Sequence, residues 1–210
     1  MNSRLASRPL YEEVAERLRQ RIFAGDLAAG AWIDEAEITA LYGISRTPLR
    51  EAIKVLAAEG IITMRPRRGA YVTEVDEQEL REVFELMTLL ESDAAGVVAA
   101  KASAAQLDAL QNLHQSLAAN IGDREAFFKL NEQFHITLLN AANNRWRAQT
   151  VADLRKVMKL ARHNSLFKTG RVEQSLKEHG AIVAALVARD SVAASAAMRF
   201  HMEQGLEAAS

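Results

Sequence analysis

The sequence predicts a mainly α-helical protein in two parts, in which three helices and a two-stranded β-hairpin precede an all-α antiparallel helical bundle. Apolar residues recur with the spacing of a buried helix face along most of the chain. Two short β-prone runs, 61–64 and 70–73, flank an arginine-rich turn. Residues 77–208 contain no proline and are divided by short loops, which favour antiparallel neighbouring helices. We therefore expect one domain over 1–74 and a second over 75–210.

Two helices are expected in the first forty residues. The first stops near Gly25, and the second opens with Asp34 and Glu35, acids that suit the positive end of a helix dipole. Their buried faces are marked by Leu10, Val14, Leu18 and Ile22 in the first helix and by Ile33, Ile38 and Leu41 in the second.

The third predicted helix begins at Ser45 and ends at Glu59–Gly60, with a buried stripe on one side and a cationic stripe on another. We expect the Ser45 hydroxyl to accept a backbone N–H bond, and Pro48 falls in the first turn, where a missing donor is tolerated. Arginine suits bidentate bonds to guanine, so this helix is a candidate for DNA recognition, although a solvated surface helix can show the same pattern. The two stripes are Leu49, Ala52, Ile53 and Leu56, and Arg46, Arg50 and Lys54.

The hairpin that follows has a basic tip, Arg65-Pro66-Arg67-Arg68-Gly69. From residue 44 to residue 70 there are six Lys/Arg and two Asp/Glu, whereas the whole chain has a net charge of −1. A basic loop is usually only solvated surface, but one that follows a recognition helix is placed for phosphate or minor-groove contact. The first 74 residues thus predict a winged helix-turn-helix that binds double-stranded DNA.

Length and composition fit a two-domain cytoplasmic protein. The 210 residues are 49% hydrophobic, enough to bury two modest cores. The absence of cysteine excludes disulfides and thiolate metal sites. No apolar run at the N-terminus or elsewhere has the length of a signal core or a membrane span, so we expect no membrane partner.

Six helices are predicted in the second domain. Gly122, Asn143–Asn144, Gly170 and Asp190 mark breaks between them. The expected ranges are 77–101, 104–120, 123–142, 146–167, 171–188 and 190–208.

Polar side chains lie on three of the apolar helix faces in this bundle. Asn131 and His135 are one turn apart on the third helix, His179 is on the fifth, and His201 is on the last. Each histidine alone is more simply a hydrogen-bonded core or surface residue. Three together, with an amide oxygen one turn away, indicate a divalent metal site, because neutral imidazole suits Zn, Ni, Co or Mn.

Two other kinds of function, an enzyme and a structural DNA-bridging protein, fit parts of this pattern. Glu132-x-x-His135 has the spacing of a ferritin-like carboxylate site, but the second such pair is missing. The sequence also has no Gly-rich phosphate loop, nucleophile elbow or Cys/His dyad, so no enzyme is expected. A purely structural DNA-bridging protein would have no ligand cavity in its second domain.

Residues 5–74 resemble the DNA-binding domain of GntR-type transcriptional regulators. The family phrase contains "G-V-S-R-T-P-V-R-E-A-L", and the chain has Gly43-Ile44-Ser45-Arg46-Thr47-Pro48-Leu49-Arg50-Glu51-Ala52-Ile53 in its place. The resemblance implies base and phosphate contacts by Arg46, Thr47 and Arg50, and a close approach of Gly69 to the minor groove. With the helix start and the basic tip, the expected DNA-binding residues are Ser45, Arg46, Thr47, Arg50, Arg67, Arg68 and Gly69.

Residues 79–207 resemble the FCD effector domain of the FadR subfamily. In that domain an Asp or Asn, a His four residues later and two further His bind one metal, and Asn131, His135, His179 and His201 occupy those places. The resemblance implies a divalent ion, with Zn, Ni or Mn the best candidates, a small carboxylate effector, and a homodimer. The dimer would bind a palindromic operator, most simply as a repressor, and effector binding would change the spacing of its recognition helices.

Two departures from the subfamily bear on the effector. Asn131 is neutral where many relatives have Asp, which lowers the charge of the site. Met87 stands four residues before Glu91, where relatives commonly have an Arg that could pair with a carboxylate. The effector would then be less acidic or be anchored elsewhere, for example by Arg162.

Overall fold

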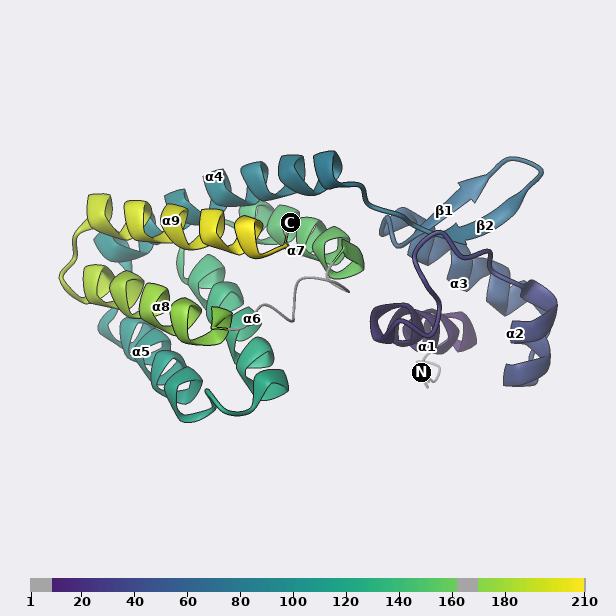
Figure 1. The fold of residues 1–210 in the computed structure, drawn as a ribbon, viewed down its shortest axis with the longest axis horizontal. Helices are drawn as coiled ribbons and strands as arrows, with labels where there is room; N and C mark the ends of the chain where they lie inside the picture. The colour runs from purple at the N-terminus through teal and green to yellow at the C-terminus, as the bar shows by residue number, and fades with distance from the viewer. Residues whose placement is uncertain (1–8, 162–169, 210) are drawn as a thin grey trace, which may run out of the picture. The chain divides into compact units, whose positions relative to one another are not determined.

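The structure is a computed structural model that describes residues 9–161 and 170–209 (Figure 1). It contains two compact units, and the first boundary between them along the chain falls between Asp76 and Glu77. The predicted mainly helical fold, with a small hairpin after three helices, is confirmed. None of the described helices is both long and apolar enough to cross a membrane.

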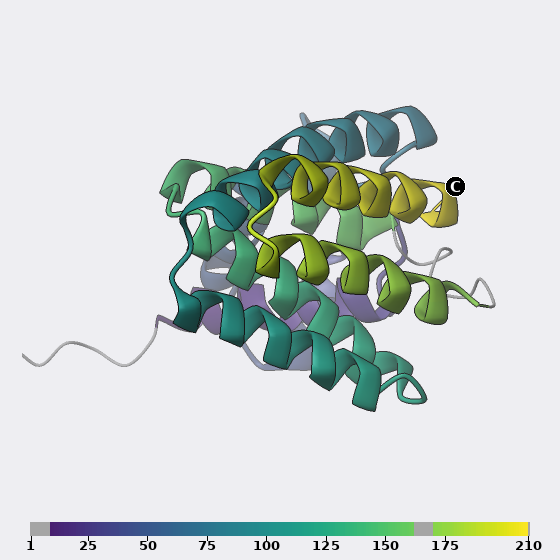
Figure 2. The same cartoon turned by 90° about the vertical axis from the view of Figure 1, so that its left-hand side faces the viewer.

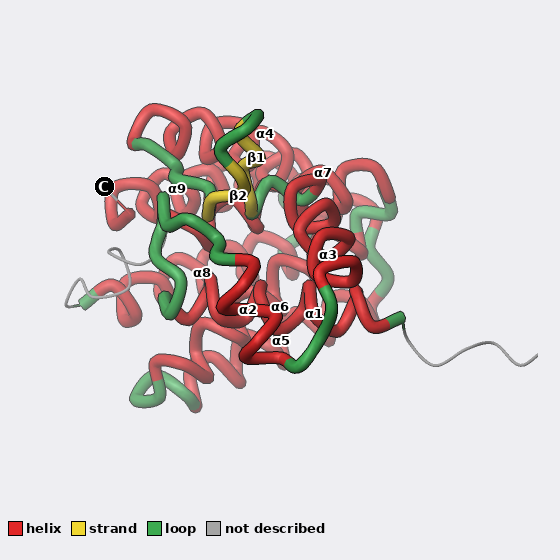
Figure 3. Tube along the Cα trace, turned by 90° about the vertical axis from the view of Figure 1, so that its right-hand side faces the viewer, coloured by secondary structure: helices red, strands yellow, loops and turns green. Residues whose placement is uncertain are grey.

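The N-terminal unit is the predicted winged helix-turn-helix (Figure 3). Its helices are α1 (Leu10–Ala24), α2 (Glu35–Tyr42) and α3 (Arg46–Ala58), and its strands are β1 (Ile62–Arg65) and β2 (Gly69–Val72). The strands are antiparallel, with Ile62 opposite Val72 and Arg65 opposite Gly69, so the basic residues form the turn between them. The predicted β-prone runs, 61–64 and 70–73, are each shifted by one residue from the observed strands.

The buried stripe of α3 is the one that the sequence predicts, and it joins the core of this unit. Ser45 occupies the N-cap position, but its side chain makes no capping hydrogen bond, so that part of the prediction was wrong. Pro48 at the third helical position lacks one of the two N–H groups that usually donate to a serine cap, and Ser45 does not accept from the other, that of Thr47. Asp34 does cap α2, accepting from the backbone N–H groups of Ala36 at 2.8 Å and Glu37 at 3.1 Å.

Among the described residues, six helices follow the N-terminal unit along the chain, as predicted. They are α4 (Glu77–Lys101), α5 (Ala104–Ala119), α6 (Arg124–Ala141), α7 (Arg145–Ala161), α8 (Arg171–Val187) and α9 (Ser191–Ala209). Helix α9 lies between α4 and α8, and α5 packs against α6 and α8 (Figure 2). The predicted continuation of α7 to residue 167 lies outside the described residues.

Gly96 allows α4 and α9 to approach closely. A Cβ atom at this position would stand 2.5 Å from the Ser195 hydroxyl oxygen and 3.2 Å from the Ser191 carbonyl oxygen. The Ser195 hydroxyl in turn donates to the Ser92 carbonyl oxygen at 2.8 Å.

Candidate DNA interface and metal centre

The cationic stripe of α3 is exposed. Arg50 donates through Nε to Glu35 of α2 at 2.9 Å, and Lys54 donates to Glu51 on its own helix at 2.8 Å. Arg46, at the start of the helix, is also exposed. Exposed ion pairs of this kind contribute about 0–1 kcal/mol, so exchanging Glu35 for a phosphate or a base would cost little.

The wing turn presents two further arginines to solvent. Arg67 and Arg68 are exposed, and Arg67 adopts a φ of 62°, which residues other than glycine rarely take. Gly69 has a φ of 96°. The Tyr71 hydroxyl donates to the carbonyl oxygen of Arg68 at 3.2 Å and so links the turn to β2.

Three of the four predicted metal ligands meet in the core of the helical unit. His135 on α6, His179 on α8 and His201 on α9 are buried, and the atoms they offer to a metal lie within 4.8 Å of one another. Asn131 lies one turn before His135 on α6. Its side-chain oxygen is buried without a hydrogen-bond partner among the described residues.

A buried glutamate orients His135. Nδ1 of His135 lies 2.5 Å from a carboxylate oxygen of Glu91 on α4, and Arg155 on α7 donates to the other oxygen at 2.6 Å. An ionised carboxylate only accepts, so Nδ1 carries the proton and Nε2 keeps its lone pair. Such an outer carboxylate is the usual support of a metal-binding histidine.

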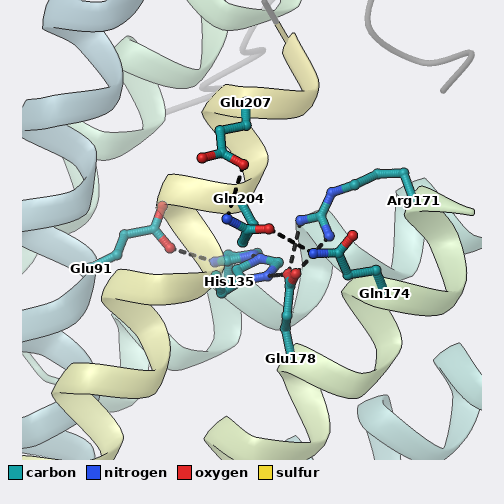
Figure 4. Close-up of polar contacts among 8 residues, drawn as sticks. Glu91, His135, Arg171, Gln174, Glu178, Gln204 and Glu207 are labelled. Carbon is teal, nitrogen blue, oxygen red and sulfur yellow. Dashed lines mark hydrogen bonds and ion pairs between the residues drawn. The ribbon is translucent and has the colours of Figure 1, made fainter.

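A second pair, Arg171 and Glu178 on α8 (Figure 4), orients the ring of His201. Its Nδ1 lies 2.7 Å from Glu178, and Arg171 donates to both oxygens of that carboxylate at 2.9 Å. The same reasoning puts the proton of His201 on Nδ1 and the lone pair on Nε2. Two hydrogen-bonded Arg–Glu–His series, one ending at His135 and the other at His201, therefore meet at the histidine cluster.

The two Nε2 atoms lie 3.2 Å apart. With both protons on Nδ1, two lone pairs face each other at that distance, and neither atom can donate to the other. Nitrogen ligands about 2 Å from a shared metal ion are themselves separated by about 3 Å. The arrangement therefore fits a cation between His135 and His201.

His179 supplies the third imidazole. Neither of its ring nitrogens has a hydrogen-bond partner among the described residues, although the side chain is fully buried. Its ring centre lies 4.6 Å from that of His201 and 5.4 Å from that of His135. A buried polar atom without a partner costs about 1–3 kcal/mol, which a metal bond at one nitrogen would offset.

The electrostatics favour the metal-binding forms of these groups. Burial lowers the pKa of His135 to about 4 and holds the pKa of His179 well below its usual value. Burial alone would raise the pKa of Glu91, but Arg155 and His135 outweigh it and lower that pKa to about 2. At neutral pH His135 and His179 are thus neutral and the Glu91 carboxylate is charged, as metal binding requires.

The sequence analysis did not identify the residues that orient the histidines. The carboxylate beside His135 is Glu91, not the neighbouring Glu132 of the ferritin-like spacing. A signal for Glu91 exists, since it is a lone acid on the buried face of α4 between Met87 and Ala94. The proposed effector anchor Arg162 lies outside the described residues.

Known protein families match both units. Residues 10–72 match the bacterial regulatory proteins of the gntR family, and residues 82–204 match the FCD domain. The chain is 30% identical over 200 residues to the HTH-type transcriptional repressor RspR of Escherichia coli K12, covering 94% of this chain and 88% of that protein. It is 29% identical over 211 residues to a probable D-xylose utilization operon transcriptional repressor of Paenarthrobacter nicotinovorans, covering 99% and 92% of the two chains.

Solved structures share the fold. E. coli McbR/YncC superimposes with a TM-score of 0.78 at 22% identity, covering 96% of this chain and 97% of that one. The relatives are transcriptional regulators, which confirms that this protein is not an enzyme. The chain belongs to the GntR family of bacterial transcriptional regulators and carries an FCD domain in its C-terminal part.

Proposed function

We propose that this regulator is a homodimeric repressor that binds a palindromic operator and responds to a small carboxylate bound at a metal in its FCD domain. The observation that carries the metal part of the proposal is the meeting of three buried imidazoles, of which His179 has no hydrogen-bond partner at either nitrogen among the described residues. The DNA-binding residues would be Ser45, Arg46, Thr47, Arg50, Arg67, Arg68 and Gly69.

Asn131, His135, His179 and His201 would hold the ion. Three imidazole nitrogens and an amide oxygen suit Zn, Ni or Mn. When bound, the ion would act as a Lewis acid and attract an anionic oxygen of the effector. The protein's own part is to keep His135 and His201 in the Nδ1–H form through Glu91 and Glu178.

The charge of the site supports a carboxylate as effector. As metal ligands, three imidazoles and an amide bring no charge. The carboxylates of Glu91 and Glu178 are each paired with an arginine, so these charged side chains balance one another. A divalent cation would therefore leave uncompensated positive charge in a buried position. Burying such charge is costly, and an anionic ligand on the ion would reduce that cost.

Exposed apolar side chains support the dimer. Leu86 and Leu89 on α4 are about half exposed, and Val97 and Val192 line a groove between α4 and α9. Exposed apolar side chains of this kind would be covered in an interface, and two-fold symmetry would match a palindromic operator. The repressor assignment rests on the two relatives named as repressors. A protein that binds an operator would act in the cytoplasm.

Operator selection with the purified full-length protein tests the proposal. We expect enrichment of a short inverted repeat, bound by two chains, whose affinity changes about 5- to 150-fold when metal and the matching carboxylate are both present. A protein that prefers no duplex over random DNA, under any of these conditions, contradicts the proposal. Binding that a metal chelator leaves unchanged, with every carboxylate tried, contradicts its effector part.

A further inference from the structure

The wing, which is the hairpin of β1 and β2 with the turn between them, pairs with a third short extended segment, residues 30–33. Backbone hydrogen bonds of 2.9–3.1 Å join residues 30–33, just before α2, to β2. In this short ladder Trp32 stands opposite Tyr71. Because successive residues of an extended segment point to opposite faces, Ile33 is buried in the core and Trp32 lies on the outer face, 55% exposed.

The indole of Trp32 occupies the space above Gly69. A Cβ atom at Gly69 would lie 2.9 Å from Nε1 of Trp32, which is closer than side chains tolerate. Gly69 also has a left-handed φ of 96°, which glycine adopts without strain. This position thus requires glycine both for its backbone and for its contact with the indole.

The turn beside Gly69 has few other supports. The Arg65 guanidinium lies 4.7 Å from the centre of the Tyr71 ring, and the Tyr71 hydroxyl binds the carbonyl oxygen of Arg68. Neither the Arg67 nor the Arg68 guanidinium has an ion-pair partner within the part of the chain that the structure describes. The direction of these two side chains is therefore set by the backbone of the turn.

A single exposed tryptophan is ordinary on a protein surface. Trp32 differs because it contacts the one residue that ends the basic turn and because it is bonded through its own strand segment to β2. We propose that Trp32 is a positioning residue for DNA binding, which braces Gly69 and so fixes the path along which the turn presents Arg67 and Arg68 to phosphates. This inference rests on the proposed role of the wing and requires no contact between Trp32 and DNA.

Operator binding at several salt concentrations tests this role. We expect Trp32→Ala to weaken binding about tenfold and to reduce the salt slope by about one, as the loss of a phosphate contact would. In an Arg67→Ala/Arg68→Ala background the same change should have almost no further effect. Trp32→Phe should restore most of the affinity, and Trp146→Ala, at the other exposed tryptophan, should leave binding unchanged.

General destabilisation by Trp32→Ala would weaken binding equally in both backgrounds, so an equal loss overturns the proposal. An unaltered affinity in Trp32→Ala overturns it as well, and both results leave operator binding by the wild type intact. Thermal unfolding gives a test that needs no DNA. Gly69→Ala should lower the melting temperature less in the Trp32→Ala protein than in the wild type, and equal decreases would show that the indole does not brace Gly69.

Discussion

Nε2 of His135 and Nε2 of His201 face each other at 3.2 Å, and a buried glutamate holds the opposite nitrogen of each ring. The glutamates fix the tautomers that direct both lone pairs to one point. Without a positive charge at that point the two nitrogens repel, and His179 next to them remains without a partner among the described residues. Glu91 and Glu178, which are not themselves proposed ligands, thus hold the two histidines in the orientation that a cation site requires.

Glu91→Gln should weaken metal binding about 10- to 100-fold, because a neutral amide no longer favours the Nδ1–H form of His135. Asp93→Asn is the matched control, since this acid lies two residues away on α4 but is exposed and pairs with Arg147. Metal affinity measured by competition with a chromogenic chelator distinguishes the two. Equal affinities of Glu91→Gln and wild-type protein would show that Glu91 does not support the site.

The metal-free protein should lose stability as the pH falls from about 6.5 to 4. His135 has a folded pKa of about 4, so in this window the unfolded chain binds a proton that the folded protein does not. The free energy of unfolding should then fall by about 3 kcal/mol from this group alone. Below about pH 4.5 Glu91, with its folded pKa of about 2, adds a further loss of the same sign.

Urea unfolding in the presence of a chelator, at intervals from pH 7 to 4, measures this dependence. His135→Gln is the control, because its amide can still donate to Glu91 but does not titrate. We expect a flatter profile for that variant. A wild-type profile that is level between pH 6.5 and 4.5 would refute the neutral, buried state of His135.

Arg46→Ala and Arg50→Ala should each cost about 1–3 kcal/mol of operator binding if these side chains contact bases. Lys54→Ala, on the same stripe but outside the proposed set of DNA-binding residues, should have a smaller effect. Arg67→Ala or Arg68→Ala should instead weaken binding to all sequences and reduce its salt dependence. Anisotropy titrations with operator and random duplexes separate the two classes, and identical sequence discrimination by all four arginine variants would rule out base reading by α3.

Gly96→Ala should destabilise the helical unit by about 1–3 kcal/mol, because the added methyl group overlaps Ser195 and presses on the Ser191 carbonyl. The helix preference of alanine acts in the opposite direction but is smaller, at about 1 kcal/mol. At Gly122 an added methyl group meets no atom within 4 Å, so Gly122→Ala should be neutral or slightly stabilising. Chemical unfolding of both variants makes the comparison, and equal stabilities would contradict the close packing of α4 on α9.

The helices and the histidine cluster could be predicted because local spacing determines them. The stripe from Leu49 to Leu56 has the helical period, and His135, His179 and His201 each interrupt an apolar face of that period. Because the three helices belong to one small bundle, imidazoles on their buried faces are expected to meet in its core. The two Arg–Glu–His series could not be predicted in the same way. They depend on which residues come opposite one another on α4, α6 and α7 in the first series, and on α8 and α9 in the second.

Two local features were also beyond the sequence. Trp32 pairs with β2 through a bridge of a few residues, which is too short to show the alternation of a strand. Ser45 stands at the N-cap position as predicted, but whether its hydroxyl makes the capping bond depends on local geometry that the sequence does not report. In both cases the deciding quantity is the position of a single backbone N–H or side chain, whereas periodicity reports only on faces.

Calorimetric titration of the chelator-stripped, full-length protein with Zn, Ni and Mn tests the central claim most directly. We predict saturable binding of one ion per chain for at least one of these metals, lost in His179→Ala and in His201→Ala and retained in His114→Ala, a histidine outside the cluster. Because binding to the folded state alone stabilises it, the metal should add about 2.7 kcal/mol at a hundredfold excess over Kd. Absence of binding for all three metals, or binding that survives His179→Ala unchanged, would contradict the assignment of His135, His179 and His201 as a metal centre.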